Sequence, residues 1–347
     1  MGCILTVRDL TVEFHTPEGV VHAVDHASYQ VLPGEVVGIV GESGSGKTVS
    51  TLAVLGLLPK PGRVTDGEIL FGGRDLLRVS PRELRGIRGK DISMVFQDPQ
   101  SSLNPVFTIG QQIVAVVRAH DRRVSQAAAR DRAVELLERV GVADARHRID
   151  DYPHQWSGGM SQRAMIAMAL VNEPKLLIAD EPTTALDVTI QAQVLDVLRR
   201  AKRDTGATVV LITHDLGVVA EMADRVVVMY AGRVVENGTV FEVFHAPRHP
   251  YTLGLLGSLP RLNTQVHHLQ PIPGQPPSLI NVPSGCPFHP RCRLRQGRQR
   301  CVDEVPPLMP TEGSGHASAC HFFSEMPAEV VAVSNEIGVD LRAGAPR

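Results

Sequence analysis

Short apolar runs alternate with helical patterns along about the first 260 residues of the chain. Three runs, at 35–40 (EVVGIV), 175–179 (KLLIA) and 208–213 (TVVLIT), are continuous and rich in β-branched residues, which predicts buried strands. Helical patterns at 48–58 and through 190–198 follow the first two runs. Because strand, helix, strand order implies right-handed crossovers between parallel strands, the pattern predicts an α/β domain with a largely parallel core sheet.

The apolar pattern changes twice along the chain. An amphipathic helix at 125–140, with Ala129, Ala133, Leu136 and Val140 on one face, predicts a helical insert. Beyond residue 260 the chain is rich in proline, arginine and cysteine and has little periodicity, which predicts a second, smaller unit. We therefore expect a domain over residues 1–262 with its helical insert at about 98–165, a cysteine-rich segment over 263–324, and a loosely ordered tail over 325–347.

The charge balance and the hydropathy limit the classes of function. The 35 lysines and arginines nearly match the 37 aspartates and glutamates, and the two signs are interspersed, which argues against a nucleic-acid surface. The sequence has no run of about 18 apolar residues and no charged-then-apolar secretion pattern at its N-terminus. We expect a soluble protein that stays inside the cell, so that other subunits would supply any membrane spans.

A glycine-rich stretch lies between the first predicted strand and the helix after it. Residues 41–48 (GESGSGKT) fit the pattern G-x-x-x-x-G-K-[ST], whose backbone N–H groups turn toward phosphate oxygens at the positive end of a helix. Its lysine would neutralise the β- and γ-phosphates, and its threonine would hold magnesium. An ordinary glycine turn is the alternative, but the flanking strand and helix favour a phosphate site formed by Gly41, Ser43, Gly44, Ser45, Gly46, Lys47 and Thr48.

Two carboxylates, Asp180 and Glu181, follow the predicted strand at 175–179. In open α/β sheets ligands bind at the carboxyl ends of the strands, so both side chains are expected near the phosphate site. Asp180 would bind magnesium through water, and Glu181 would orient the water that attacks the γ-phosphate. A solvated acidic strand end is the other interpretation.

The stretch 157–162 (SGGMSQ) resembles the signature sequence of the ATP-binding cassette (ABC) family. The usual form is Leu-Ser-Gly-Gly-Gln; this chain has Trp156 and Met160 at the first and fifth places and keeps Ser157, Gly158 and Gly159 between them. Serine and bare glycine amides at a helix start form an anion site, which the resemblance implies acts on ATP held by a partner domain. By itself, Ser-Gly-Gly would only indicate a helix cap.

Four further residues match motifs of the ABC family in the family's order, and the resemblance gives each a role. Phe14 would stack on adenine; the alternative is a strand-core residue. Gln97, in the sequence VFQDP, would contact magnesium and the attacking water. Asp187 would contact the opposing subunit, cap a helix, or do both. His214 would contact the γ-phosphate and steady Glu181, the alternative being a buried structural histidine.

A narrower resemblance concerns the ATPases of oligopeptide and dipeptide permeases. Four segments carry it, at 98–105 (DPQSSLNP), 157–163 (SGGMSQR), 249–252 (HPYT) and 285–292 (GCPFHPRC). Together with the earlier matches, it implies a phosphate-loop NTPase fold that binds ATP and Mg2+ and hydrolyses ATP. The chain would then be an enzyme, the ATPase subunit of an ABC importer of peptides, peripheral on the cytoplasmic face of the cell membrane.

Four of the five cysteines crowd into the late segment, while Cys3 stands alone. In some peptide-permease ATPases four such cysteines bind a 4Fe-4S cluster. The spacing here lacks the paired C-x2-C rhythm of common zinc sites, so we expect a 4Fe-4S cluster, with zinc or no metal as the alternatives. Its ligands would be Cys286, Cys292, Cys301 and Cys320. Because the nucleotide domain has its own core, nucleotide binding is expected not to depend on this segment.

The resemblance also implies partners. They would be a second ABC ATPase subunit, either a copy or a paralogue, two transmembrane permease subunits, and an extracytoplasmic peptide-binding protein that acts through the permease. No nucleic-acid partner is expected. The alternatives are import of nickel or another small solute, a soluble ABC ATPase without a transport role, and a cassette that binds ATP as a regulatory clamp; Glu181 and His214 argue against the last.

Overall fold

The computed structural model describes residues 2–184, 187–258, 272–311 and 315–326. The chain divides into two compact units. The first comprises residues 1–4, 32–35 and 78–212, and the second comprises 5–31, 36–77 and 213–347. The expected boundary at 262/263 and all but two residues of the expected tail lie outside the described residues.

The second unit contains an antiparallel sheet and a separate set of strands around β3. The antiparallel sheet has the order β2-β1-β4-β5, with β1 at Leu5–Thr16, β2 at Gly19–Val31, β4 at Gly62–Phe71 and β5 at Arg74–Asp75. The other set has the order β11-β12-β10-β9-β3, with β3 at Val36–Val40, β9 at Arg225–Tyr230, β10 at Arg233–Thr239, β11 at Met309–Pro310 and β12 at Ala317–Ser318. Only β3 and β9 pair in parallel in this set, so its sheet is less parallel than the apolar pattern predicts.

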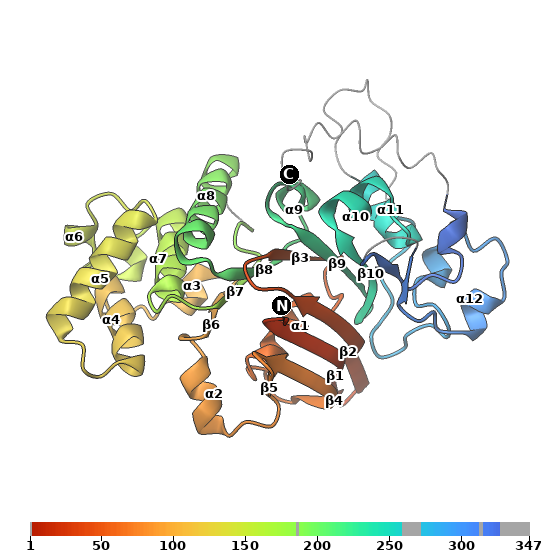
Figure 1. The fold of residues 1–347 in the computed structure, drawn as a ribbon, viewed down its shortest axis with the longest axis horizontal. Helices are drawn as coiled ribbons and strands as arrows, with labels where there is room; N and C mark the ends of the chain where they lie inside the picture. The colour runs from red at the N-terminus through yellow and green to blue at the C-terminus, as the bar shows by residue number, and fades with distance from the viewer. Residues whose placement is uncertain (1, 185–186, 259–271, 312–314, 327–347) are drawn as a thin grey trace. The chain divides into compact units, whose positions relative to one another are not determined.

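Short helices cover the strands of the second unit (Figure 1). They are α1 (Lys47–Val54), α9 (Leu216–Met222), α10 (Val240–His245), α11 (Pro250–Gly257) and α12 (Arg300–Asp303), with 3-10 turns η2 (His289–Arg291) and η3 (Phe323–Glu325). Apolar residues of α9, α10 and α11 meet those of β9 and β10 in one core, which includes Tyr230, Phe244, Tyr251 and Phe288. Phe288 lies in this core, and Leu279, Cys286 and Cys292 pack against it, so this part of the cysteine-rich segment shares the core of the second unit.

Helix α1 ends earlier than the predicted range of 48–58. Gly56 adopts a positive φ of 58°, its N–H donates to Ala53 O, and the N–H of Leu57 donates to Leu52 O. This pair of hydrogen bonds is the Schellman arrangement, in which a left-handed glycine closes the helix. The helix thus ends at its glycine cap, before the prolines that follow.

The first unit contains three parallel strands in the order β8-β7-β6. They are β6 (Ile92–Val95), β7 (Leu176–Asp180) and β8 (Thr208–Ile212), of which β7 and β8 fall where the apolar runs predict strands. All the side chains of these strands are buried. A continuous apolar run is what a parallel strand requires when both of its faces are covered.

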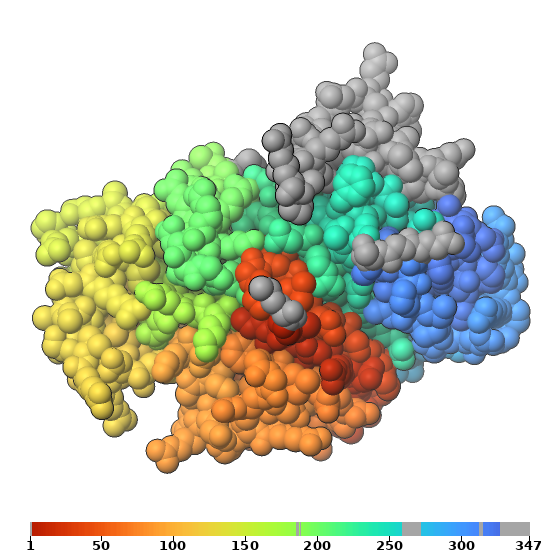
Figure 2. Space-filling view, in the orientation of Figure 1, coloured from red at the N-terminus to blue at the C-terminus, as the bar shows by residue number. Residues whose placement is uncertain are grey.

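Helices make up most of the rest of the first unit. They are α2 (Pro81–Ile87), α3 (Pro99–Ser102), α4 (Ile109–His120), α5 (Gln126–Arg139), α6 (Ala145–Arg148), α7 (Gly158–Leu170) and α8 (Val188–Thr205), with the 3-10 turn η1 at Pro153–Gln155. Helix α5 confirms the predicted helix, and Ala129, Ala133 and Val140 of the predicted face are buried. Leu136 is only half-buried, and its neighbour Leu137 is buried instead. Figure 2 shows that the residues of α4, α5 and α6 (yellow) form a contiguous part of the surface of the first unit.

Among the helices that the structure describes, none has both the length and the apolar content needed to cross a membrane.

Candidate functional site

The glycine-rich loop turns between β3 and α1, as its pattern predicts. Gly41 has a φ of 152° and Gly46 a φ of 96°. A Cβ atom at Gly41 would lie 2.2 Å from Met229 O, and one at Gly46 would lie 2.4 Å from Ala23 O. Both positions therefore require glycine for two reasons, the backbone angle and the close approach of other backbone atoms. Helix α1 begins after Gly46 without a side-chain cap, so its start presents backbone N–H groups of the kind that bind anions.

Lys47 lies folded back on this loop. It is buried, and its Nζ donates to Gly41 O at 2.8 Å and to Glu42 O at 2.9 Å. The loop carbonyls thus hold the ammonium group at the loop, where a bound phosphate could replace them as its partner. The N–H of Glu42 donates to the Tyr251 hydroxyl at 2.7 Å.

His214 lies beside the beginning of the same loop. It is exposed and lines a hollow of about 350 Å³ together with Gly41, Glu42, Leu255 and Arg291. The alternative interpretation of a buried structural histidine is therefore wrong. Leu255 and Arg291 are additional residues of this hollow that the motifs do not indicate.

Phe14 lies in β1, opposite Val21 on β2 and Gly62 on β4. Its ring covers Gly62, because a Cβ atom there would come within 2.5 Å of Phe14 Cε1. The side chain is half-buried, so one part of the ring packs in the sheet and another remains accessible.

Glu181 and Gln97 lie together in the first unit. Gln97 Nε2 donates to Glu181 Oε2 at 3.1 Å, and the hydroxyl of Thr184 donates to the same oxygen at 2.8 Å. Glu181 follows β7 directly and has a positive φ of 44°, an uncommon conformation for a residue with a side chain. Asp180, the last residue of β7, is 2% exposed. The two adjacent carboxylates thus have different environments. Asp180 is buried at the end of the strand, whereas Glu181 accepts hydrogen bonds from an amide and a hydroxyl.

Ser157 and Asp187 are both helix caps. The Ser157 hydroxyl accepts from Met160 N at the start of α7, and an Asp187 carboxylate oxygen accepts from Ile190 N at 3.0 Å at the start of α8. A Cβ atom at Gly159 would lie 2.8 Å from Ile190 Cγ2, so close packing explains this glycine. Gly158 is exposed and has open space where its side chain would be, so no local contact explains it.

The four late cysteines form no disulfide and are half-buried. Burial raises the pKa of the Cys286 thiol to about 12, and the charges of Cys320, Cys292 and Cys301 add to this shift. Burial likewise raises the pKa of Cys320 to about 11. The 4Fe-4S and zinc predictions are not supported by side-chain geometry, because no group of three or more His, Cys, Asp or Glu side chains among the described residues is placed to hold a metal ion.

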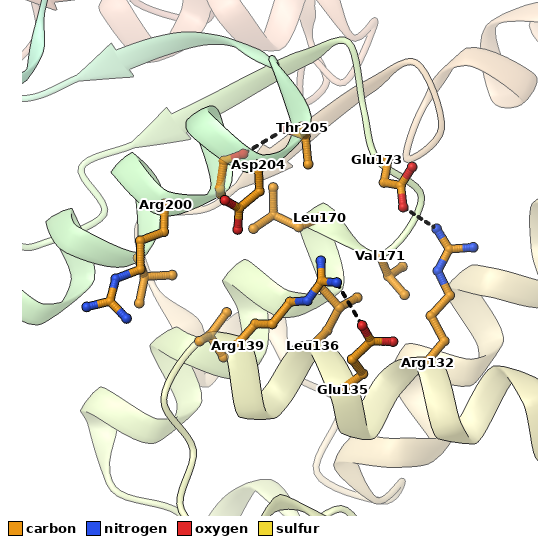
Figure 3. A pocket seen from close by; sticks show the side chains of 13 residues that line it. Arg132, Glu135, Leu136, Arg139, Leu170, Val171, Glu173, Arg200, Asp204 and Thr205 are labelled. Atoms are coloured by element: carbon orange, nitrogen blue, oxygen red, sulfur yellow. Dashed lines mark hydrogen bonds and ion pairs between the residues drawn. The ribbon is translucent and has the colours of Figure 1, made fainter.

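A further hollow, of about 320 Å³, lies in the first unit between α5, α7 and α8 (Figure 3). Ion pairs between Arg139 and Glu135 and between Arg132 and Glu173 lie along it. None of the residues that the motifs indicate lines this hollow, so it is separate from the predicted site.

Family models match two parts of the chain. A model of the ABC transporter family matches residues 24–184. A model described as the oligopeptide/dipeptide transporter, C-terminal region, matches residues 235–301. The second match covers Phe244, Tyr251 and Phe288 of the core of the second unit and three of the four late cysteines.

Similar proteins extend the match to nearly the whole chain. A dipeptide transport ATP-binding protein, DppD, of Bacillus subtilis is 49% identical over 97% of this chain and 99% of its own length. The DppD of Escherichia coli is 49% identical over 92% of this chain and 96% of its own. Among solved structures, the dimeric ATP-binding cassette MJ0796 bound to ADP and phosphate is 28% identical, with a TM-score of 0.62, over 68% of this chain and 98% of its own.

Proposed function

The chain belongs to the ABC transporter ATPases of the oligopeptide and dipeptide group, and we propose that it hydrolyses ATP to drive the import of short peptides. The observation that carries this proposal is the phosphate loop, which turns between β3 and α1 at an uncapped helix start with Lys47 held on its carbonyls.

We assign the binding of the nucleotide to the residues that the family's motifs indicate. Lys47 and the loop amides would bind the phosphates, and Phe14 would stack on the adenine through the accessible part of its ring. The Thr48 hydroxyl, the Gln97 amide oxygen and the Asp180 carboxylate are hard oxygen donors, which suit magnesium. Magnesium, when bound there, would neutralise phosphate charge.

Glu181 is the proposed general base for hydrolysis. Its carboxylate would accept a proton from the attacking water, and the hydrogen bonds from Gln97 and Thr184 would hold it in one orientation. His214, beside the phosphate loop, would donate to the γ-phosphate.

Ser157, Gly158, Gly159 and Asp187 are proposed to act on the nucleotide of a second ATPase subunit, a copy or a paralogue. The open space at Gly158 supports this, because its own helix and neighbours leave the position free for another molecule to approach closely. The other expected partners are two permease subunits and, through them, an extracytoplasmic peptide-binding protein. Such an assembly would hold this chain at the cytoplasmic face of the membrane.

We further propose that the late cysteines hold a 4Fe-4S cluster. Four free thiols, with Arg295, Arg298 and Arg300 around Cys301, support the donor set and provide charge to offset an anionic cluster. Protein purified without oxygen should be brown and should contain about four iron ions and as many sulfide ions per chain. Colourless protein with one zinc and no sulfide would instead support the zinc alternative, in which His289, His316 or His321 could also serve.

Reconstitution tests the transport function. The chain, its partner ATPase and the permease subunits should be placed in vesicles with the peptide-binding protein, and dipeptide uptake should be measured with and without ATP. We expect uptake that requires ATP and that stops when Glu181 is replaced by Gln. ATP hydrolysis without dipeptide uptake, but with uptake of nickel, would assign the importer to another solute.

A further inference from the structure

Arg291 joins the cysteine-rich segment to the phosphate loop. Its Nη1 donates to Glu42 Oε2 at 2.6 Å and its Nη2 donates to Glu42 Oε1 at 2.9 Å. The two residues are 249 positions apart in the sequence, and Glu42 is the second residue of the phosphate loop. Two parallel hydrogen bonds between a guanidinium and a carboxylate form the strongest and most directional ion pair that side chains offer.

The pair is built into the core of the second unit. The Arg291 side chain is 5% exposed and that of Glu42 is 26% exposed. Arg291 Nε also donates to Pro273 O at 2.9 Å, and Nη1 donates to the Tyr230 hydroxyl at 3.3 Å. These contacts fix the plane of the guanidinium, so it can meet Glu42 in only one orientation.

Glu42 is consequently held at three points. Arg291 holds its carboxylate, the Tyr251 hydroxyl accepts from its N–H, and Lys47 donates to its carbonyl. Because Glu42 is already fixed, this residue loses little further conformational entropy when a ligand binds to the loop.

The charge of Glu42 gives the pair a second consequence. A carboxylate within a loop that receives a polyphosphate would repel the ligand if it had no partner, and a partly buried site screens such repulsion poorly. Arg291 neutralises this carboxylate.

The packing of the segment between Cys286 and Cys292 places Arg291 beside Glu42. Phe288, from the same segment, packs against Tyr230 and Tyr251 with ring centroids 5.2 Å and 5.4 Å apart, and both cysteines lie against the same core. The geometry of this short segment therefore determines where the guanidinium lies.

We propose that Arg291 is a positioning residue for ATP binding, which neutralises Glu42 and fixes the phosphate loop, and that it makes the cysteine-rich segment part of the nucleotide site. This inference rests on the proposed nucleotide site at Lys47. It also reverses the expectation that nucleotide binding is independent of the segment.

A charge-exchange series tests the inference on the purified full chain, by titration with a fluorescent ATP analogue and Mg2+. Arg291→Gln should raise the dissociation constant about tenfold or more, because Glu42 is left with no partner. Glu42→Gln should bind at least as tightly as the unsubstituted chain, since Arg291 then adds attraction. The double variant Glu42→Gln/Arg291→Gln should return to within about threefold of the unsubstituted chain, because the two substitutions act on one pair.

The controls separate this inference from the proposed site. Arg130→Gln breaks an exposed bidentate pair with Asp150 in the first unit and should leave the dissociation constant unchanged. Lys47→Ala is the reference variant for loss of the phosphate site. If this variant binds the ATP analogue normally, the proposed phosphate site is wrong.

If Lys47→Ala loses binding while Arg291→Gln binds normally, the inference alone fails. A double variant as weak as Arg291→Gln would exclude charge neutralisation. If Arg291→Gln does not fold, Glu42→Gln tests the inference by itself. A tenfold loss of affinity for the ATP analogue in that variant would contradict the role assigned to the Glu42 charge.

Discussion

The side-chain amide of Gln97 donates a hydrogen bond to the carboxylate of Glu181, with Nε2 and Oε2 3.1 Å apart. Gln97 follows β6 and Glu181 follows β7, and these strands pair in parallel, so both residues lie at the same edge of the sheet. The Thr184 hydroxyl donates to the same oxygen at 2.8 Å, so two donors from different parts of the first unit converge on Oε2. This arrangement fits a role of Glu181 as a general base, with Gln97, which follows the neighbouring strand, controlling the orientation of its carboxylate.

Glu181→Gln should retain ATP binding and stop hydrolysis. The amide keeps the size of the side chain but cannot accept the proton of the attacking water, so we expect the rate to fall about 10²- to 10⁴-fold. Steady-state phosphate release and nucleotide binding should be measured on the same preparation. Glu173→Gln, at an exposed glutamate that pairs with Arg132, is the control. Normal turnover by Glu181→Gln would place the base elsewhere.

At saturating Mg2+, Gln97→Ala should lower the rate of hydrolysis by about tenfold with little change in ATP affinity. The substitution removes one hydrogen bond that orients Glu181 but leaves the carboxylate and its bond to Thr184. Comparison of kcat with KM for ATP checks this, with Gln100→Ala as the control for an exposed neighbour. A large rise in KM with kcat unchanged would show that Gln97 serves binding instead.

Ser157→Arg should damage the ATP site of the partner subunit more than the site at this chain's own Lys47. In an assembly of two distinguishable ATPase subunits, photocrosslinking of a nucleotide analogue would report each site separately. Ser125→Arg is a matched control, because Ser125 also caps a helix, accepting from Ala128 N at 3.1 Å. Loss confined to the site on the substituted chain would contradict the two-chain geometry.

His249 should make the protein sensitive to acid. The ring is buried at the start of α11, where Nδ1 accepts from Tyr251 N at 3.1 Å, and burial lowers its pKa to about 3. An unfolded histidine has a pKa of about 6.5, so below that pH the unfolded chain takes up a proton that the folded chain does not. The contribution of neutral His249 to the free energy of unfolding is thus complete above about pH 6.5 and falls by roughly 2 kcal/mol by pH 5.

Denaturant unfolding at pH 7 and pH 5 would measure this effect. His249→Asn keeps an acceptor for the helix start but does not titrate, so its loss of stability between the two pH values should be smaller by roughly 2 kcal/mol. Equal losses in both proteins would show that His249 is not responsible.

Cys292→Ser should weaken ATP binding as well as cluster binding. The substituted position adjoins Arg291, so a change in the segment between Cys286 and Cys292 should displace the guanidinium from Glu42. Iron content and ATP affinity should be measured together, with Cys3→Ser as the control. Loss of iron with unchanged ATP affinity would show that the segment and the phosphate loop are independent.

The phosphate loop, the strands at β3, β7 and β8, and the caps at Ser157 and Asp187 could be predicted from sequence because each depends on residues close together in the chain. Glycine spacing, short apolar runs and cap residues are local signals. The pairing of β1 with both β2 and β4 was not predicted, since the partners of an antiparallel strand depend on contacts that the apolar pattern does not specify.

Only the tertiary structure showed that Arg291 belongs with the phosphate loop. In the sequence it is one of several arginines around the cysteines, and this crowding indicates a solvated face that also offsets the charge of a cluster. Folding packs Phe288 against Tyr230 and Tyr251, and this packing carries Arg291 to Glu42 across 249 positions of sequence. The sequence by itself thus determined the glycine loop and its lysine, because their spacing is a local signal, whereas side-chain packing in the second unit decided which residue pairs with the Glu42 carboxylate.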